Sequence, residues 1–144
     1  MRRPRVLIPI GVAVCIAALV GWVLDPPHAL SIEAESVRRV EVQFDPWGEE
    51  NTRRPGASSE DREAITELVA VIRTAQRTTE HKCGSRGSIA FRDSIGLPAK
   101  LEFLPGHHPE WYEIRTGGQI YKLPRREFVE AMRRIGVDVP LECQ

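Results

Sequence analysis

The chain lacks the short motifs that mark common catalytic and nucleotide-binding sites. Its 144 residues contain no G-x-S-x-G, Walker A, G-x-G-x-x-G or H-E-x-x-H pattern. Internal repeats and low-complexity tracts are also absent, which excludes an array of repeated units. The sequence therefore predicts neither catalysis nor a bound cofactor.

The chain has few cysteines and no excess of positive charge. The three cysteines form no C-x-x-C pair, which disfavours thiol redox catalysis. Residues 25–144 carry 17 basic and 20 acidic side chains, a net charge of −3. Because nucleic-acid binding needs an excess of Lys and Arg on one face, this composition argues against a nucleic-acid partner. The four Arg-Arg pairs, at 38–39, 53–54, 125–126 and 133–134, are interpreted as solvated surface.

One uncharged run, Val6–Leu24, dominates the N-terminal part of the chain. As an α-helix its nineteen residues would span roughly 28 Å, close to the roughly 30 Å thickness of a bilayer's hydrocarbon core. The basic residues 1–5 precede the run and Asp25 follows it, so the positive-inside rule places the N-terminus in the cytoplasm and residues 25–144 outside. The sequence predicts a signal anchor that crosses the membrane once as a transmembrane helix.

A cleaved signal peptide is the alternative, because it also begins with a basic region and an apolar run. However, the run is longer than the usual apolar region of about 7–15 residues, and residues 25–34 contain no A-x-A pair at a suitable distance. Both interpretations export the domain that follows, and cleavage would release it as a secreted domain.

Two cysteines, Cys83 and Cys143, lie in the part of the chain that is expected to be exported. That compartment is oxidising, so the pair is a candidate disulfide, which would close a loop of 61 residues. In the chain-entropy model such a loop stabilises the fold by about 4 kcal/mol. Two free thiols, or a reactive cysteine, are the alternatives.

The chain after a short stalk, residues 25–36, is predicted to form one α+β domain, residues 37–144. Apolar and polar residues alternate in VRRVEVQF (37–44), which predicts a half-buried strand, and a polar surface loop is expected at 45–58. Four more alternating segments predict an antiparallel meander, with Gly117-Gly118 in its last hairpin. These segments are GSIAFRD (87–93), AKLEFL (99–104), WYEIRT (111–116) and QIYKL (119–123).

Two amphipathic helices are expected to pack on this sheet. The first is capped by Ser58 or Ser59. Its apolar stripe consists of Ile65, Leu68, Val69, Ile72 and Ala75. The second begins at Pro124 and ends at Gly136, and its stripe consists of Phe128, Ala131, Met132 and Ile135. The predicted architecture is β-α-β-β-β-β-α, an antiparallel sheet with both helices on one face.

Histidines and tryptophans supply the candidate sites, and each has an ordinary structural interpretation. His107 and His108, with Glu110 nearby, could hold zinc, but a solvated loop explains them as well, because adjacent histidines on a strand point to opposite faces. Trp47 and Trp111 would anchor a binding partner if exposed, whereas at the edge of the core they would only pack. The candidates for a binding surface are therefore Trp47, His107, His108 and Trp111, and no catalytic or metal-binding residue is predicted.

The sequence thus predicts a single-pass membrane protein that displays a small extracytoplasmic binding or accessory domain. Its expected contacts are the lipid bilayer, through Val6–Leu24, and another protein. One alternative is a small exported enzyme or metal-binding protein that uses the His107-His108 loop. The other is a secreted domain released by signal-peptide cleavage.

Overall fold

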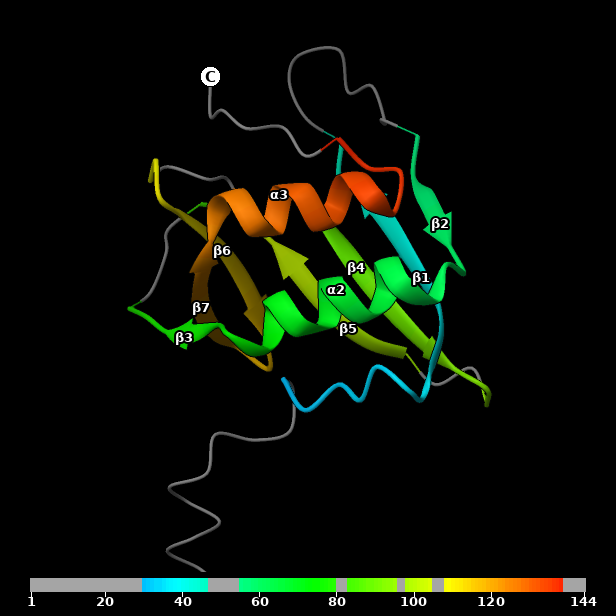
Figure 1. Ribbon diagram of the computed structural model, residues 1–144. Coiled ribbons are helices and arrows are strands. Elements are labelled where there is room, and N and C mark those ends of the chain that lie inside the picture. The colour runs from blue at the N-terminus through cyan, green and yellow to red at the C-terminus, as the bar shows by residue number, and fades with distance from the viewer. Residues whose placement is uncertain (1–29, 47–54, 80–82, 96–97, 105–107, 139–144) are drawn as a thin grey trace, which may run out of the picture.

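Two helices lie on one face of a seven-stranded antiparallel sheet in the computed structural model (Figure 1). The strand order across the sheet is β2-β1-β4-β5-β6-β7-β3. The α+β class expected from the sequence is therefore confirmed. The structure describes residues 30–46, 55–79, 83–95, 98–104 and 108–138.

The five longer strands coincide with the alternating segments of the sequence. They are β1 (Val37–Phe44), β4 (Gly87–Asp93), β5 (Pro98–Phe103), β6 (Trp111–Thr116) and β7 (Gln119–Pro124). Neighbouring side chains on a strand point to opposite faces, so the apolar residues of each strand reach the helix-covered face together. The β6–β7 turn is Gly117-Gly118, with φ angles of 54° and 75°, the left-handed conformation that a two-residue hairpin turn favours.

Helices α2 (Arg62–Arg73) and α3 (Arg125–Arg134) bury most of the apolar stripes that the sequence predicts. The exception is Ala75, which lies beyond the end of α2 and is half-buried. The cap of α2 is Asp61, whose Oδ1 accepts hydrogen bonds from the backbone N–H groups of Glu63 (2.9 Å) and Ala64 (3.2 Å). The predicted cap at Ser58 or Ser59 is therefore wrong, because both serines belong to an edge strand.

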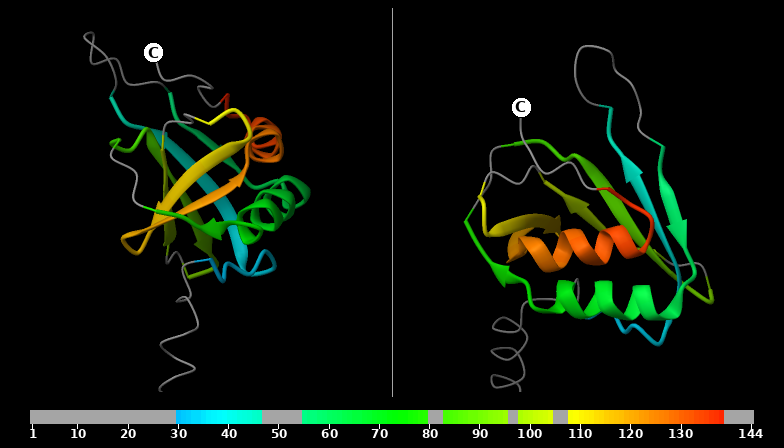
Figure 2. Two further views of the ribbon diagram at one scale, coloured as in Figure 1. Left: turned by 90° about the vertical axis from the view of Figure 1, so that its left-hand side faces the viewer. Right: turned by 45° about the horizontal axis from the view of Figure 1, so that its top comes forward.

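Two short strands, β2 (Ala57–Ser59) and β3 (Gln76–Arg77), form the edges of the sheet. β2 pairs with β1, with Val40 opposite Ser59, and β3 pairs with β7, with Gln76 opposite Lys122. The sequence predicts a sheet of only four or five strands, because segments as short as β2 and β3 show no alternation. Since α2 connects the two edge strands, it runs across the whole width of the sheet (Figure 2).

Residues 30–36, which the sequence assigns to the stalk, pack against the domain. Ile32 and Ala34 are only 6% and 8% exposed and belong to the hydrophobic core. The Arg62 guanidinium fastens this segment to α2, because it donates hydrogen bonds to the carbonyl oxygens of Val37 and of Glu35 (3.4 Å). The described part of the chain therefore enters the fold along the lower end of the sheet in Figure 1.

Several predicted features lie outside the described residues, so they stay predictions. These are the membrane segment Val6–Leu24, the binding candidates Trp47 and His107, and Cys143 of the proposed disulfide. None of the helices in the described part of the chain has the length and apolar composition that a membrane crossing requires.

Candidate functional site

The face of the sheet opposite the helices, here called the open face, is mostly polar and half-buried. Ion pairs join neighbouring strands across it: Arg92 Nε lies 2.8 Å from Glu41 Oε2, and Arg115 Nη1 lies 3.4 Å from Glu102 Oε2. The open face is a candidate binding surface because its side chains are ordered by the sheet yet remain in contact with solvent.

Trp111 stands on the open face at the start of β6, between a cation and an imidazole. The Lys122 Nζ lies 5.0 Å from the centroid of its ring, a cation–π geometry, and the ring of His108 lies 6.2 Å away at 31°. In the β6–β7 register Trp111 is opposite Pro124. Lys122 lies two residues before Pro124 on the same face of the sheet, so it is the diagonal neighbour of Trp111 and its side chain reaches the ring. We call His108, Trp111 and Lys122 the aromatic cluster.

Two hydrogen bonds from Arg125, the first residue of α3, hold the aromatic cluster in place. Arg125 donates through its backbone N–H to the carbonyl oxygen of Glu110 (2.9 Å) and through Nη1 to the carbonyl oxygen of His108 (2.8 Å). The Nδ1 of His108 accepts a hydrogen bond from the Glu110 backbone N–H (3.1 Å). His108 is therefore oriented by the protein, with its second ring nitrogen available to a ligand or to solvent.

Near β6 and β7, the described residues of the connection from β3 to β4 contact the strands of the open face. Ile120, opposite Arg115 on this face, is 5% exposed, and its carbonyl oxygen accepts a hydrogen bond from the Thr78 backbone N–H (3.0 Å). Arg115 Nη2 donates to the carbonyl oxygen of Cys83 (3.4 Å), which places the half-buried Cys83 beside β6.

Tyr112, next to Trp111 on β6, points the other way and is fully buried. Its ring packs on Phe128 of α3, with centroids 4.8 Å apart. Burial raises the pKa of its hydroxyl above the usual range, although the positive charges of Arg125 and Arg86 act to lower it. Tyr112 is thus a neutral core residue and is unsuited to act as a base.

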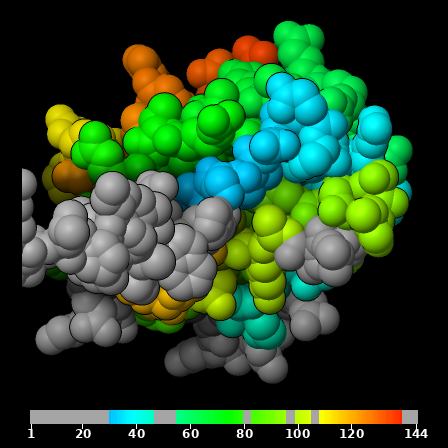
Figure 3. Space-filling view, turned by 90° about the horizontal axis from the view of Figure 1, so that it is seen from below, coloured from blue at the N-terminus to red at the C-terminus, as the bar shows by residue number. Residues whose placement is uncertain are grey.

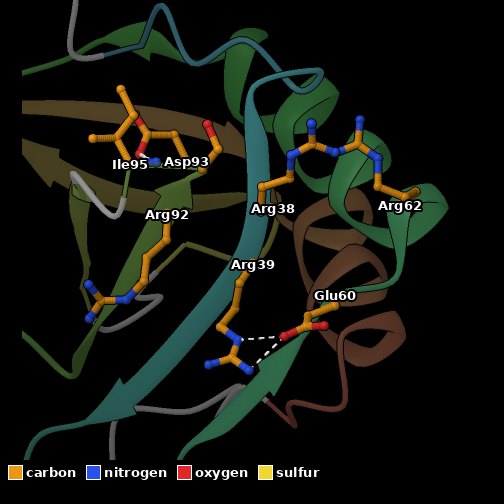
Figure 4. A pocket seen from close by; sticks show the side chains of 8 residues that line it. Arg38, Arg39, Glu60, Arg62, Arg92, Asp93 and Ile95 are labelled. Atoms are coloured by element: carbon orange, nitrogen blue, oxygen red, sulfur yellow. Dashed lines mark hydrogen bonds and ion pairs between the residues drawn. The ribbon is translucent and has the colours of Figure 1, made fainter.

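A second surface feature is a shallow hollow of about 580 Å³ where β1 starts and β4 ends, at the end of the sheet that is lowest in Figure 1. Figure 4 shows its lining from close by. The hollow is lined by Arg38, Arg39, Glu60, Arg62, Arg92, Asp93, Ser94 and Ile95, and we call it the arginine hollow. Arg39 is bound by Glu60, at 2.6 Å, and Arg92 by Glu41, at 2.8 Å. Arg38 and Arg62 extend toward each other in Figure 4, and neither forms an ion pair among the described residues.

A β-bulge creates the arginine hollow by exposing two consecutive arginines. The β1–β4 register shifts between Val37 and Arg39, so Arg38 is an extra residue without an opposite partner. Bulges redirect a side chain out of the regular alternation, and here the redirected side chain is Arg38. The spacing of Val37 and Val40 signals this in the sequence, since strict alternation would place these two valines on opposite faces.

The structure brings together two of the four binding candidates from the sequence, His108 and Trp111. The sequence indicates Lys122 as one of several charged residues on an exposed sheet face, but its contact with Trp111 becomes evident only once the hairpin register is known. The sequence interpretation treats Arg38 and Arg39 as plain surface. Among the described residues, no three His, Cys, Asp or Glu side chains are grouped so that they could hold a metal ion.

The fold and its surfaces define a small α+β domain with one helix-covered face and one polar face. No family model matches this chain, and comparison with curated proteins and with solved structures finds no match either. The function must therefore be argued from the geometry alone.

Proposed function

We propose that the chain is a single-pass membrane protein whose α+β domain binds another protein on the extracytoplasmic side. The N-terminus is in the cytoplasm, Val6–Leu24 is the anchor, and the aromatic cluster is the contact with the partner. The domain acts by binding, without a catalytic step.

The aromatic cluster is the observation that carries the binding role. Trp111 presents a large ring that is half-buried and already fixed by Lys122, His108 and the β6 backbone, so little conformational entropy is lost when a partner covers it. Tryptophan is enriched among residues that dominate binding energy at protein interfaces. The packed segment 30–36 supports the tethering, because it leaves only residues 25–29 between the predicted anchor and the domain.

Membrane attachment is tested by fractionating cells that express the full chain. We expect the protein to stay with the membranes after an alkaline carbonate wash, and its mass to include the intact N-terminus. A mature N-terminus near residue 30, with the protein in the soluble fraction, would refute the anchor and favour the secreted alternative.

The binding role is tested with a photo-crosslinking amino acid placed at Glu113 or Glu102, both on the open face. The matched control carries the same group at Glu130, which is exposed on the outer side of α3. We expect a discrete adduct from the open-face positions only, and expect Trp111→Ala to abolish it. Equal adducts at the control position, or adducts that survive Trp111→Ala, would show that the aromatic cluster is not the contact.

A further inference from the structure

The arginine hollow lies at the end of the domain where the chain arrives from the predicted anchor. Figure 3 views this end and shows residues 30–36, in blue and cyan, on the same face as the end of β4, in yellow-green. The β4 end carries Ser94 and Ile95, and Ile95 is 81% exposed, the one large hydrophobic side chain in the described part of the chain with that degree of exposure. An exposed isoleucine beside guanidinium groups offers an apolar side chain to the bilayer interface and cations to anionic head groups.

The length of the connection limits how far this face can be from the bilayer. Leu24 ends the predicted anchor and Leu30 is already part of the domain, so six Cα–Cα steps join them, at most about 20 Å when fully extended. The head-group region extends roughly 5–8 Å beyond the hydrocarbon core. A domain tethered this closely presents the face around Leu30 to the head groups.

The charge of the hollow is suited to an anionic group. Its lining contains four arginines and two carboxylates, and Arg38 and Arg62 form no ion pair among the described residues. Guanidinium groups bind phosphate through paired N–H donors, and Arg62 keeps donors to spare beyond its bonds to Val37 and Glu35.

Two exposed glutamates on the same face, Glu33 and Glu35, oppose an anionic surface. Both glutamates belong to the segment that precedes β1. Their negative charge repels an anionic surface, so only the part of this face that carries the arginines attracts one. Removing one of these acids is therefore expected to strengthen contact with an anionic surface.

We propose that the arginine hollow docks the tethered domain onto anionic phospholipid head groups, with Arg38 and Arg62 binding lipid phosphate and Ile95 entering the interface. This inference rests on the proposed anchor. Docking holds the lower end of the sheet against the bilayer and so fixes the direction in which the open face meets its partner.

The test measures amide hydrogen exchange of the full chain in nanodiscs of phosphatidylcholine alone, or with about one third phosphatidylglycerol. We expect slower exchange of the Ser94 and Ile95 amides in the anionic discs, relative to the amides of α3 as an internal reference. High salt should remove the difference, because screening weakens attraction to charged lipid.

Three variants separate docking from general charge effects. Arg38→Gln should lower the ratio of docked to undocked domain about fivefold, the factor expected for one arginine at an anionic surface. Arg126→Gln is the matched control, an exposed arginine on α3 (side chain 87% exposed), and should leave the ratio unchanged. Glu35→Gln should raise it.

The outcomes distinguish the docking from the anchor. Equal exchange in both lipids, with the chain retained in the discs, overturns the docking and leaves the anchor standing. An Arg126→Gln effect as large as that of Arg38→Gln overturns the assignment to the hollow. If the chain does not stay with the discs, the anchor fails and the docking fails with it.

Discussion

The two faces of the sheet are built from the same strands but carry different kinds of side chain. On the helix-covered face, side chains such as Val40, Ile89, Leu101 and Ile114 are essentially inaccessible to solvent. On the open face, alternate positions of these strands carry ion pairs and the aromatic cluster, and most of their side chains are half-buried. The comparison predicts that stability resides mainly in the covered face and binding in the open face.

The reason lies in the free energy of each kind of contact. Burying a large apolar side chain contributes roughly 1.5–3 kcal/mol, whereas an ion pair in contact with solvent contributes roughly 0–1 kcal/mol. Substitutions on the open face should therefore lower the free energy of unfolding only slightly, so this face can be adapted to a binding partner. The predictions below test this difference, beginning with the largest expected effect.

Truncating Phe128 should give the largest loss of stability. Phe128 is fully buried and packs on Tyr112 between α3 and the sheet, so Phe128→Ala should lower the free energy of unfolding by about 4 kcal/mol. Urea denaturation followed by circular dichroism measures this. Glu130→Ala, an exposed change on the same helix, is the control and should cost less than about 0.5 kcal/mol. Similar losses for the two variants would contradict the proposed role of the covered face.

Adding one methyl group to the covered face should also be costly. A Cβ at Gly87 would lie 2.3 Å from the carbonyl oxygen of Gln43 and 2.3 Å from Cζ of Phe103, so Gly87→Ala forces strand β4 to shift. The expected destabilisation is about 2 kcal/mol. Gly84→Ala is the matched control, because a Cβ at Gly84 would meet no atom within 4 Å among the described residues. Thermal melts that show no difference between the two alanine variants would mean that the covered face is less tightly packed than its geometry indicates.

Much of the covered face could be predicted from the sequence, because its signals are local. The 3–4 spacing that places Ile65, Leu68 and Ile72 on one stripe depends only on helix geometry, and all three are fully buried. The alternation of Val40, Val42 and Phe44 on β1 depends likewise only on strand geometry. These features need no knowledge of which strands become neighbours.

The open face and the sheet edges could be predicted less well, because they depend on pairing between distant segments. β3 is only Gln76–Arg77, and it exists because β7 supplies its hydrogen-bonding partner. Lys122 joins Trp111 only through the β6–β7 register, and Arg38 meets Arg62 only after the bulge and the start of α2 are placed together. Sequence pattern alone identifies Trp111 and His108 as candidates but cannot assemble the groups around them.

Removing the cation from the aromatic cluster should separate binding from stability. Lys122→Met keeps the length of the side chain but removes its charge over the Trp111 ring, at a cost of about 0.5 kcal/mol to the free energy of unfolding. The photo-crosslinked adduct of the open face should nevertheless decrease strongly. Lys100→Met, an exposed change on β5, is the control for loss of charge. An adduct unchanged by Lys122→Met would remove the cation from the proposed contact.

The smallest expected effect on stability concerns Glu41, which lies between the two regions of interest. Its carboxylate binds Arg92 (2.8 Å) on the open face and lies 3.9 Å from Arg39 of the arginine hollow. Glu41→Gln should cost about 0.5 kcal/mol or less in urea denaturation, and less still at high salt, because both arginines are partly exposed to solvent. The same substitution frees positive charge beside the hollow, so hydrogen exchange at Ser94 and Ile95 in anionic nanodiscs should become slower.

Glu130→Gln, on the far side of the helices, should change neither quantity. A large loss of stability from Glu41→Gln would show that the ion pairs of the open face support the fold, and the division between a stabilising and a binding face would then be wrong.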